Sequence, residues 1–116
     1  MVKPAKRPVF AERLAQARAR AGLTQAELGL RAGLDPAVAS PRINQYERGK
    51  HEPQLKTARR LADVLGVPPA FLYTEDDLLA ELLLQWNNLT LRQKKDLLKQ
   101  VAAVKAPRSK VSPKAE

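Results

Sequence analysis

From residue 9 onward, apolar residues recur every three or four positions, which is the spacing of one buried face of an α-helix. The first stripe consists of Phe10, Leu14, Ala17 and Ala21. Gly22 follows it, and glycine is common just past a helix C-terminus because it adopts the left-handed conformation without strain. The pattern predicts a first helix that starts near Val9.

A capping box marks the start of a second helix. The Thr24 side chain can accept a hydrogen bond from the backbone of Glu27, and the Glu27 side chain can return one from the backbone of Thr24. The predicted helix covers about residues 25–32 and buries Leu28. Gly29 lies inside it, where glycine costs about 1 kcal/mol relative to alanine. Close approach by another helix would explain this glycine, and a tolerated defect is the alternative.

Two helix-start signals follow, Asp35-Pro36 and Ser40-Pro41. Each pairs a capping side chain with a proline at the first helical position, where the missing N–H does no harm. A proline inside one continuous helix would lose a backbone hydrogen bond and clash with the preceding turn. We therefore predict a short turn and then a helix at about 40–48. A single kinked helix over 36–48 is the alternative.

The helical spacing continues in the second half of the chain. One stripe consists of Leu55, Ala58, Leu61, Ala62 and Leu65. Pro68-Pro69 opens a short helix, and two Leu-rich helices follow within residues 75–104. The first of these begins with Glu75-Asp76-Asp77, because acidic residues favour a helix N-terminus. A second capping box, Thr90 with Gln93, begins the other. The fold class is therefore all-α.

The two ends of the chain differ from this pattern. Residues 1–8 carry two prolines and three cations and are predicted to form a flexible basic arm. Residues 105–116 are predicted to be a disordered basic tail. Between them we expect a domain at 9–74 and a C-terminal helical pair at 75–104.

Composition excludes several classes of function. Cysteine is absent and there is one histidine, so no thiolate or multi-histidine metal site is possible. We find no Gly-rich phosphate loop and no pairing of a nucleophile with a base, so we expect no enzyme, no cofactor and no small-molecule substrate. No apolar run is long enough to span a membrane and no secretory signal is evident, which favours a cytoplasmic protein.

The charge is basic and unevenly distributed. The 116 residues carry a formal net charge of +9, of which residues 1–74 contribute +7 and residues 75–104 contribute −1. This distribution favours an anionic partner for the first segment and apolar contacts for the second. A basic all-α domain with two short helices joined by a turn can present a helix to the DNA major groove.

Three segments carry a family resemblance: GLTQAELGLRAGL, INQYERGKHEP and LKTARRLADVLGVPPAFLY. With them the chain resembles the Cro/lambda-repressor-like (Xre-type) helix-turn-helix regulators over about residues 9–74. The resemblance implies a five-helix bundle that binds double-stranded DNA sequence-specifically. It also implies a transcriptional regulator, commonly a repressor in this family, that acts as a dimer.

The resemblance also implies which residues contact DNA. Gln25 corresponds to a glutamine that contacts a phosphate and braces the recognition helix. The residues that approach bases are Ser40, Pro41, Arg42, Asn44 and Gln45. Arg48 and Lys50 correspond to the end of the helix that holds phosphates. Ile43 and Tyr46 correspond to its buried side.

This chain departs from the family pattern between Leu34 and Gly49, where it has about four extra residues, close to one helical turn. Asp35 and Ser40 therefore compete as the start of the recognition helix. We expect Asp35 to cap a helix rather than face DNA, because phosphates would repel its charge.

The helical pair at 75–104 leaves two possibilities open. Its leucines can fold back onto the preceding bundle, or they can pack against a second copy in a homodimer, which we favour. A different function is the alternative to a DNA-binding regulator. The chain would then be an antitoxin or adaptor that binds another protein through residues 75–104, with DNA binding secondary.

Overall fold

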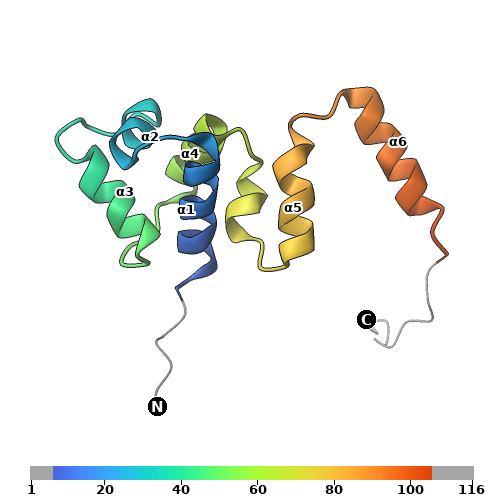
Figure 1. Ribbon diagram of the computed structural model, residues 1–116, viewed down its shortest axis with the longest axis horizontal. Coiled ribbons are helices and arrows are strands. Elements are labelled where there is room, and N and C mark those ends of the chain that lie inside the picture. The colour runs from blue at the N-terminus through green and yellow to red at the C-terminus, as the bar shows by residue number, and fades with distance from the viewer. Residues whose placement is uncertain (1–6, 106–116) are drawn as a thin grey trace, which may run out of the picture.

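The computed structural model describes residues 7–105, and this part of the chain is entirely helical, as predicted. Its elements are α1 (Val9–Ala21), α2 (Gln25–Arg31), α3 (Ala39–Glu47), α4 (Leu55–Leu65), the 3₁₀ helix η1 (Pro69–Tyr73), α5 (Asp77–Trp86) and α6 (Leu91–Ala102). The first five form a bundle, α5 lies against one side of it and α6 stands further out (Figure 1). Most of the predicted arm and nearly all of the predicted tail lie outside the described residues.

The core of the bundle is mostly aliphatic, and Phe10, Tyr46 and Phe71 are its buried aromatic side chains. Its largest fully buried side chains are Phe71, Leu14, Leu28, Ile43, Leu61, Leu72 and Val67. Two residues that the stripes placed inside are exposed. Leu55 is the first residue of α4 and is 53% exposed, and Ala21 is the last residue of α1. Both lie at the end of a helix, and periodicity alone misassigned them.

The capping boxes form as predicted. Thr24 and Thr90 accept hydrogen bonds from the backbone N–H of Glu27 and Gln93, and the side chains of these two residues accept from the threonine N–H groups. Gly22 ends α1 with a φ of 71° and Gly66 ends α4 with a φ of 72°. These local signals placed the boundaries correctly because the caps involve only residues close in sequence.

We expect the α2 capping box to make the free energy of unfolding depend on pH in the acidic range. The Thr24 N–H donates to the Glu27 carboxylate at 2.8 Å, and this bond lowers the pKa of Glu27 below its ordinary value. A lowered folded-state pKa gives stability that is present above the unfolded pKa and is lost as the pH falls through the folded one. Glu27→Gln keeps the box but cannot titrate. Urea unfolding at about pH 6 and about pH 3 should show a smaller loss for Glu27→Gln than for the unaltered protein, and equal losses would contradict this origin.

Gly29 marks the closest approach of two helices. A Cβ at this position would lie 2.8 Å from the Cβ of Ala39 and 3.0 Å from its backbone Cα and O. α3 therefore crosses α2 at the glycine, and the first of the two explanations, close helix approach, is correct.

Gly29→Ala is accordingly expected to destabilise the protein. The overpacking penalty of about 1–3 kcal/mol exceeds the gain of about 1 kcal/mol in helix propensity. Denaturant unfolding should show a net loss of up to about 2 kcal/mol. Ala26→Gly at an exposed position of the same helix is the control for propensity. A Gly29→Ala protein as stable as the original would show that α3 can shift without cost.

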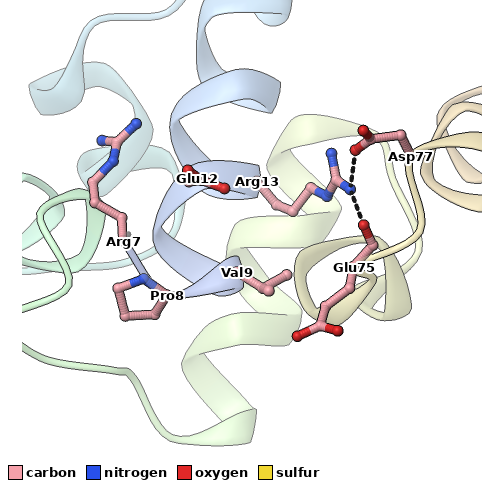
Figure 2. Close-up of a pocket in the computed structure, with 7 residues that line it drawn as sticks. All are labelled: Arg7, Pro8, Val9, Glu12, Arg13, Glu75 and Asp77. Carbon is pink, nitrogen blue, oxygen red and sulfur yellow. Dashed lines mark hydrogen bonds and ion pairs between the residues drawn. The ribbon is translucent and has the colours of Figure 1, made fainter. Parts of the chain in front are cut away.

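Arg13 joins α1 to the start of α5. It is buried, and its guanidinium donates to the backbone oxygens of Thr74 at 2.7 Å and Glu75 at 3.1 Å and to the Asp77 carboxylate at 2.9 Å (Figure 2). The group also lies 5.7 Å from the centre of the Phe71 ring. Sequence analysis did not identify this residue. The contacts fix where α5 leaves the bundle.

The two C-terminal helices are anchored differently. α5 packs on the bundle through buried Ala80 and half-buried Leu83 and Leu84. α6 has no buried residue and diverges from α5 (Figure 1). The possibility that both helices fold back onto the bundle is therefore wrong for α6.

Candidate nucleic-acid interface

The start of α3 corrects the sequence prediction. The helix begins at Ala39, and Ser40 lies in its first turn instead of capping it. The first backbone bond of the helix runs from Arg42 N–H to Val38 O at 2.9 Å, so Pro41 stands at the third helical position, where a missing N–H still costs nothing. The favoured separate turn does form, because the Asp35 carboxylate accepts from the Ala37 N–H at 2.8 Å. Asp35 therefore caps this turn and not a helix, which corrects the expectation that it would cap a helix.

One side of α3 is buried and the other is polar. The buried residues are Ala39, Ile43, Tyr46 and Glu47. At about 100° per residue, the opposite face carries Pro41, Asn44, Gln45 and Arg48. Pro41 and Arg48 are exposed, and the two amides are half-buried. Ile43 and Tyr46 are buried as predicted.

The two remaining predicted base-contacting residues lie on the flanks of this polar face. Ser40 is half-buried on the side of α3 that meets α2. Arg42 is exposed on the side that meets α4. Together with Gln45, His51, Gln54 and Thr57, Arg42 lines a recess of about 510 Å³ beside the loop after α3. The five predicted base-contacting residues thus lie on the exposed face of α3 or on one of its two flanks.

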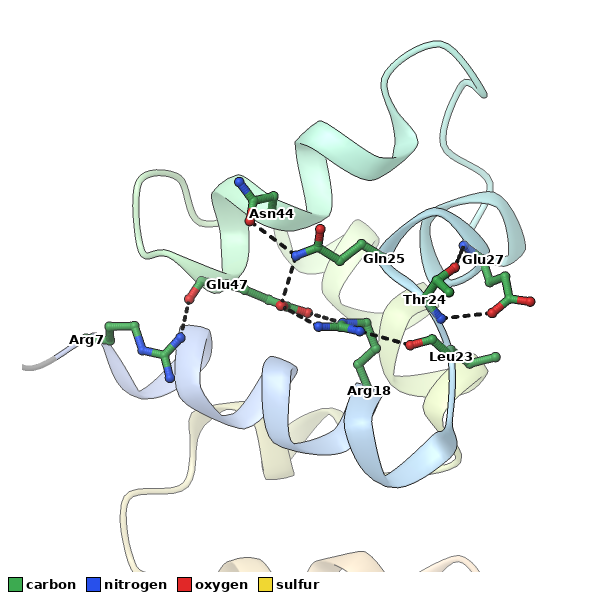
Figure 3. A network of polar contacts seen from close by, with 8 residues as sticks. All are labelled: Arg7, Arg18, Leu23, Thr24, Gln25, Glu27, Asn44 and Glu47. Atoms are coloured by element: carbon green, nitrogen blue, oxygen red, sulfur yellow. Dashed lines mark hydrogen bonds and ion pairs between the residues drawn. The ribbon is translucent and has the colours of Figure 1, made fainter.

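Glu47 organises the inner side of the interface. It is 5% exposed, and its carboxylate receives two hydrogen bonds from Arg18 of α1, one from Nε to Oε2 and one from Nη2 to Oε1 at 3.0 Å (Figure 3). Arg18 also donates to Leu23 O at 2.9 Å. The hydrogen bond to Glu47 raises the pKa of Arg18 above its ordinary value, so the Arg18 guanidinium keeps its charge. The sequence alone did not identify Arg18.

The same network holds Gln25. The Gln25 Nε2 donates to Asn44 Oδ1 and to Glu47 Oε1, both at 3.2 Å (Figure 3). A carboxylate can only accept, so the side of the Gln25 amide that faces Glu47 must be its nitrogen, and the atom of Asn44 beside that nitrogen must be its oxygen. The bracing role implied for Gln25 therefore corresponds to a direct bond to α3, and the Asn44 amide nitrogen is turned away from α2.

Cations surround the C-terminal end of α3. Arg48 follows the last helical residue, Gly49 has a φ of 75°, and Lys50 is exposed. The start of α1 reaches the same place. Arg7 Nη1 donates to the backbone oxygen of Glu47 at 3.0 Å, and Pro8 covers Gly49 so closely that a Cβ there would lie 2.6 Å from the proline Cδ. Arg7 is thus a third cation at the C-terminal end of α3.

These features define a helix-turn-helix protein, in which α2 braces an exposed α3 and cations flank that helix. The sequence matches the family HTH_3, described as helix-turn-helix, over residues 14–72. The chain belongs to this lambda-repressor-like family of DNA-binding regulators, whose members act by binding and not by catalysis.

A solved structure resembles most of the described region. It is the crystal structure of the transcriptional regulator BswR, with 46% sequence identity and a TM-score of 0.75, and the match covers 81% of this chain and 93% of that chain. The comparison with curated proteins gave no match. None of the helices in residues 7–105 is long and apolar enough to cross a membrane.

Proposed function

We propose that this protein is a sequence-specific transcriptional repressor that reads duplex DNA with α3 in the major groove. The observation that carries the proposal is the polar face of α3, which is exposed opposite a buried face and held by the Glu47 network. The major groove is about 12 Å wide and admits a helix whose side chains reach base edges. A helix held by hydrogen-bonded neighbours keeps those side chains in one register.

The residues of the interface divide by chemistry. Asn44 and Gln45 carry amides, which can pair with adenine, and Arg42 carries a guanidinium, which can pair with guanine. Ser40 and Pro41 supply contacts at the N-terminal end of α3. Gln25 has its amide nitrogen engaged with α3, so its side chain acts mainly by positioning Asn44.

Cations at the C-terminal end of α3 have a different role. Arg48 and Lys50 are exposed beside Gly49, where they can hold phosphates on either side of the groove. Phosphate contacts supply affinity and orientation without sequence choice. Together the two groups give a protein that binds all DNA weakly and one operator tightly.

Repression follows from occupancy. A regulator bound at an operator excludes polymerase from an overlapping promoter, and no catalytic step is needed. The structural neighbour BswR is named a transcriptional regulator, which supports a role in regulating transcription. We propose that the protein acts as a cytoplasmic homodimer, because two copies place two α3 helices about 34–36 Å apart, one turn of DNA.

Selection of bound sites from a random DNA library tests the proposal. We expect a two-fold symmetric site. Against that site, Gln45→Ala should lose about 1–3 kcal/mol of discrimination at one base position. Lys50→Ala should instead weaken operator and random DNA by the same factor. Equal losses on both DNAs for Gln45→Ala would remove that residue from base recognition, and no enriched sequence would contradict the proposed function.

An adaptor that binds another protein is the second candidate. The exposed leucines of α6 favour it, since Leu91 is 68% exposed and Leu98 is 60% exposed. A stable complex with a different protein that copurifies from its host and is lost in Leu98→Asp would support this function. Unchanged DNA binding in the same variant would show that the two functions are separate.

A further inference from the structure

The C-terminal helices expose two apolar stripes. On α5 the stripe consists of Leu78, Leu79 and Leu82. On α6 it consists of Leu91, Leu98 and Val101, and Val104 continues it just beyond the helix end. The α5 stripe lies opposite Ala80, which packs on the bundle, so α5 is apolar on two sides. Soluble monomers rarely leave apolar surface of this extent open to water.

The two helices carry opposite charges. Residues 75–86 contain four acidic and no basic side chains, for a net charge of −4. Residues 91–105 contain five basic and one acidic side chain, for a net charge of +4. Pairing α5 with another α5, or α6 with another α6, would bring like charges together. Pairing α5 with α6 brings opposite charges together and also covers both apolar stripes.

Within one chain the two helices make little contact. The Lys94 ammonium lies 5.1 Å from the centre of the Trp86 ring, close to the turn that joins the helices. Beyond that point α6 diverges, and Leu98, Val101 and Val104 are each at least 60% exposed. The Thr90 capping box fixes the first turn of α6 and therefore its direction. The complementary surface of each helix is thus left open.

We propose that a second copy of this chain covers both stripes by reciprocal exchange, with α6 of each copy lying along α5 of the other. The inference rests on the homodimer proposed above and specifies its contacts. The same α5–α6 contact occurs twice about a two-fold axis, which is the isologous arrangement of closed dimers. Arg13 ties the start of α5 to α1. In the dimer, α6 of one copy therefore packs on an α5 that is held firmly to the bundle of the other copy, and this fixes the position of one α3 relative to the other.

Charge exchange between two variants tests this arrangement. The first variant, Lys95→Glu with Lys99→Glu, gives α6 acidic groups. The second, Glu75→Lys with Glu81→Lys, gives α5 basic groups, and Glu75 contributes only its backbone oxygen to Arg13. Self-association is measured by sedimentation of each full-length variant and of their equimolar mixture. The matched control, Arg20→Glu with Arg59→Glu, makes the same change in net charge as the first variant at exposed positions of α1 and α4.

We expect each variant alone to dimerise about tenfold more weakly than the original protein or the control. Each double change brings the net charge of its segment to zero. We expect the mixture to recover in part, because one of its two contacts then keeps the original basic α6 on the original acidic α5, whereas each variant alone has no such contact. Pairing within one chain would leave the mixture as weak as its components, and this outcome would overturn the proposal. A dimer unaffected by either variant would also overturn it, since other contacts would then hold the copies together.

DNA binding separates this inference from the proposed function. A protein that stays monomeric at all concentrations overturns the exchange, while salt-dependent binding of α3 to an operator half-site would still support DNA recognition. If the charge variants alter dimerisation as expected but the original protein does not bind DNA, the proposed recognition of DNA is wrong and the proposed helix exchange is still supported.

Discussion

Raising the salt concentration from about 50 to about 200 mM is expected to weaken binding to duplex DNA by about 10³–10⁵-fold. Each phosphate neutralised by a lysine or arginine releases condensed counterions, and added salt opposes that release. Arg7, Arg48 and Lys50 lie at the C-terminal end of α3, so two copies supply about six contacts, and other cations can add to these. Fluorescence anisotropy titrations at several salt concentrations measure the slope directly.

Lys50→Ala tests whether phosphate contacts cause this salt dependence. Removing one phosphate contact should reduce the slope of log affinity against log salt by about 1 for each copy bound. Lys94→Ala, a cation on α6 that lies beside Trp86, should leave the slope unchanged. A flat salt response of the unaltered protein would contradict DNA as the partner, whatever the fold.

Arg18→Ala is expected to lower the free energy of unfolding by about 3–5 kcal/mol, a large share of the roughly 5–15 kcal/mol of a typical domain. The change leaves the Glu47 carboxylate buried without its cation, and water cannot replace it because the side chain is only 6% exposed. Glu47→Ala should cost less, because Arg18 is 22% exposed and can be partly hydrated. Urea unfolding followed by circular dichroism measures both.

Two controls isolate the ion pair. Arg20→Ala changes an exposed arginine two residues along the same helix and should have an effect within about 0.5 kcal/mol. The double variant Arg18→Leu with Glu47→Leu removes both charges and should be more stable than Arg18→Ala alone, because no unpaired charge stays buried. If Arg18→Ala were as stable as Arg20→Ala, the pair would have no part in holding α3.

The ion pair matters to function because the same carboxylate positions the interface. Glu47 Oε1 accepts from Gln25, and Gln25 bonds to Asn44. The buried side chain of Glu47 thereby determines which atoms of Asn44 face outward. We expect losses in Arg18→Ala to extend from stability to sequence preference.

Helix identity and most helix boundaries could be predicted from the sequence, since they depend on short-range chemistry. Thr24 with Glu27 and Thr90 with Gln93 form their caps between residues three apart, and Gly22 and Gly66 end their helices through their own φ angles. The buried face of α3 was also predictable, because Ile43 and Tyr46 follow helical spacing.

The start of α3 was not predictable in the same way. Ser40-Pro41 has the local pattern of a helix start, yet the helix begins at Ala39 without a side-chain cap. Packing selects that start, because the small Ala39 side chain lies against Gly29 of α2. A contact between residues ten apart thus overrides a signal between neighbours.

The sequence by itself determined an all-helical, basic chain with an amphipathic third helix and its family. Only the tertiary structure decided which charges are buried and which apolar residues stay exposed. In the sequence, nothing distinguishes Arg13 and Arg18 from surface arginines. In the fold, both are hydrogen-bonded to partners from distant segments of the chain. The spacing of the α6 leucines is typical of core residues, but the helix has no buried residue because it lies away from the bundle. The physical reason is the same in both cases: burial depends on where other elements lie, and periodicity within one helix carries no information about that.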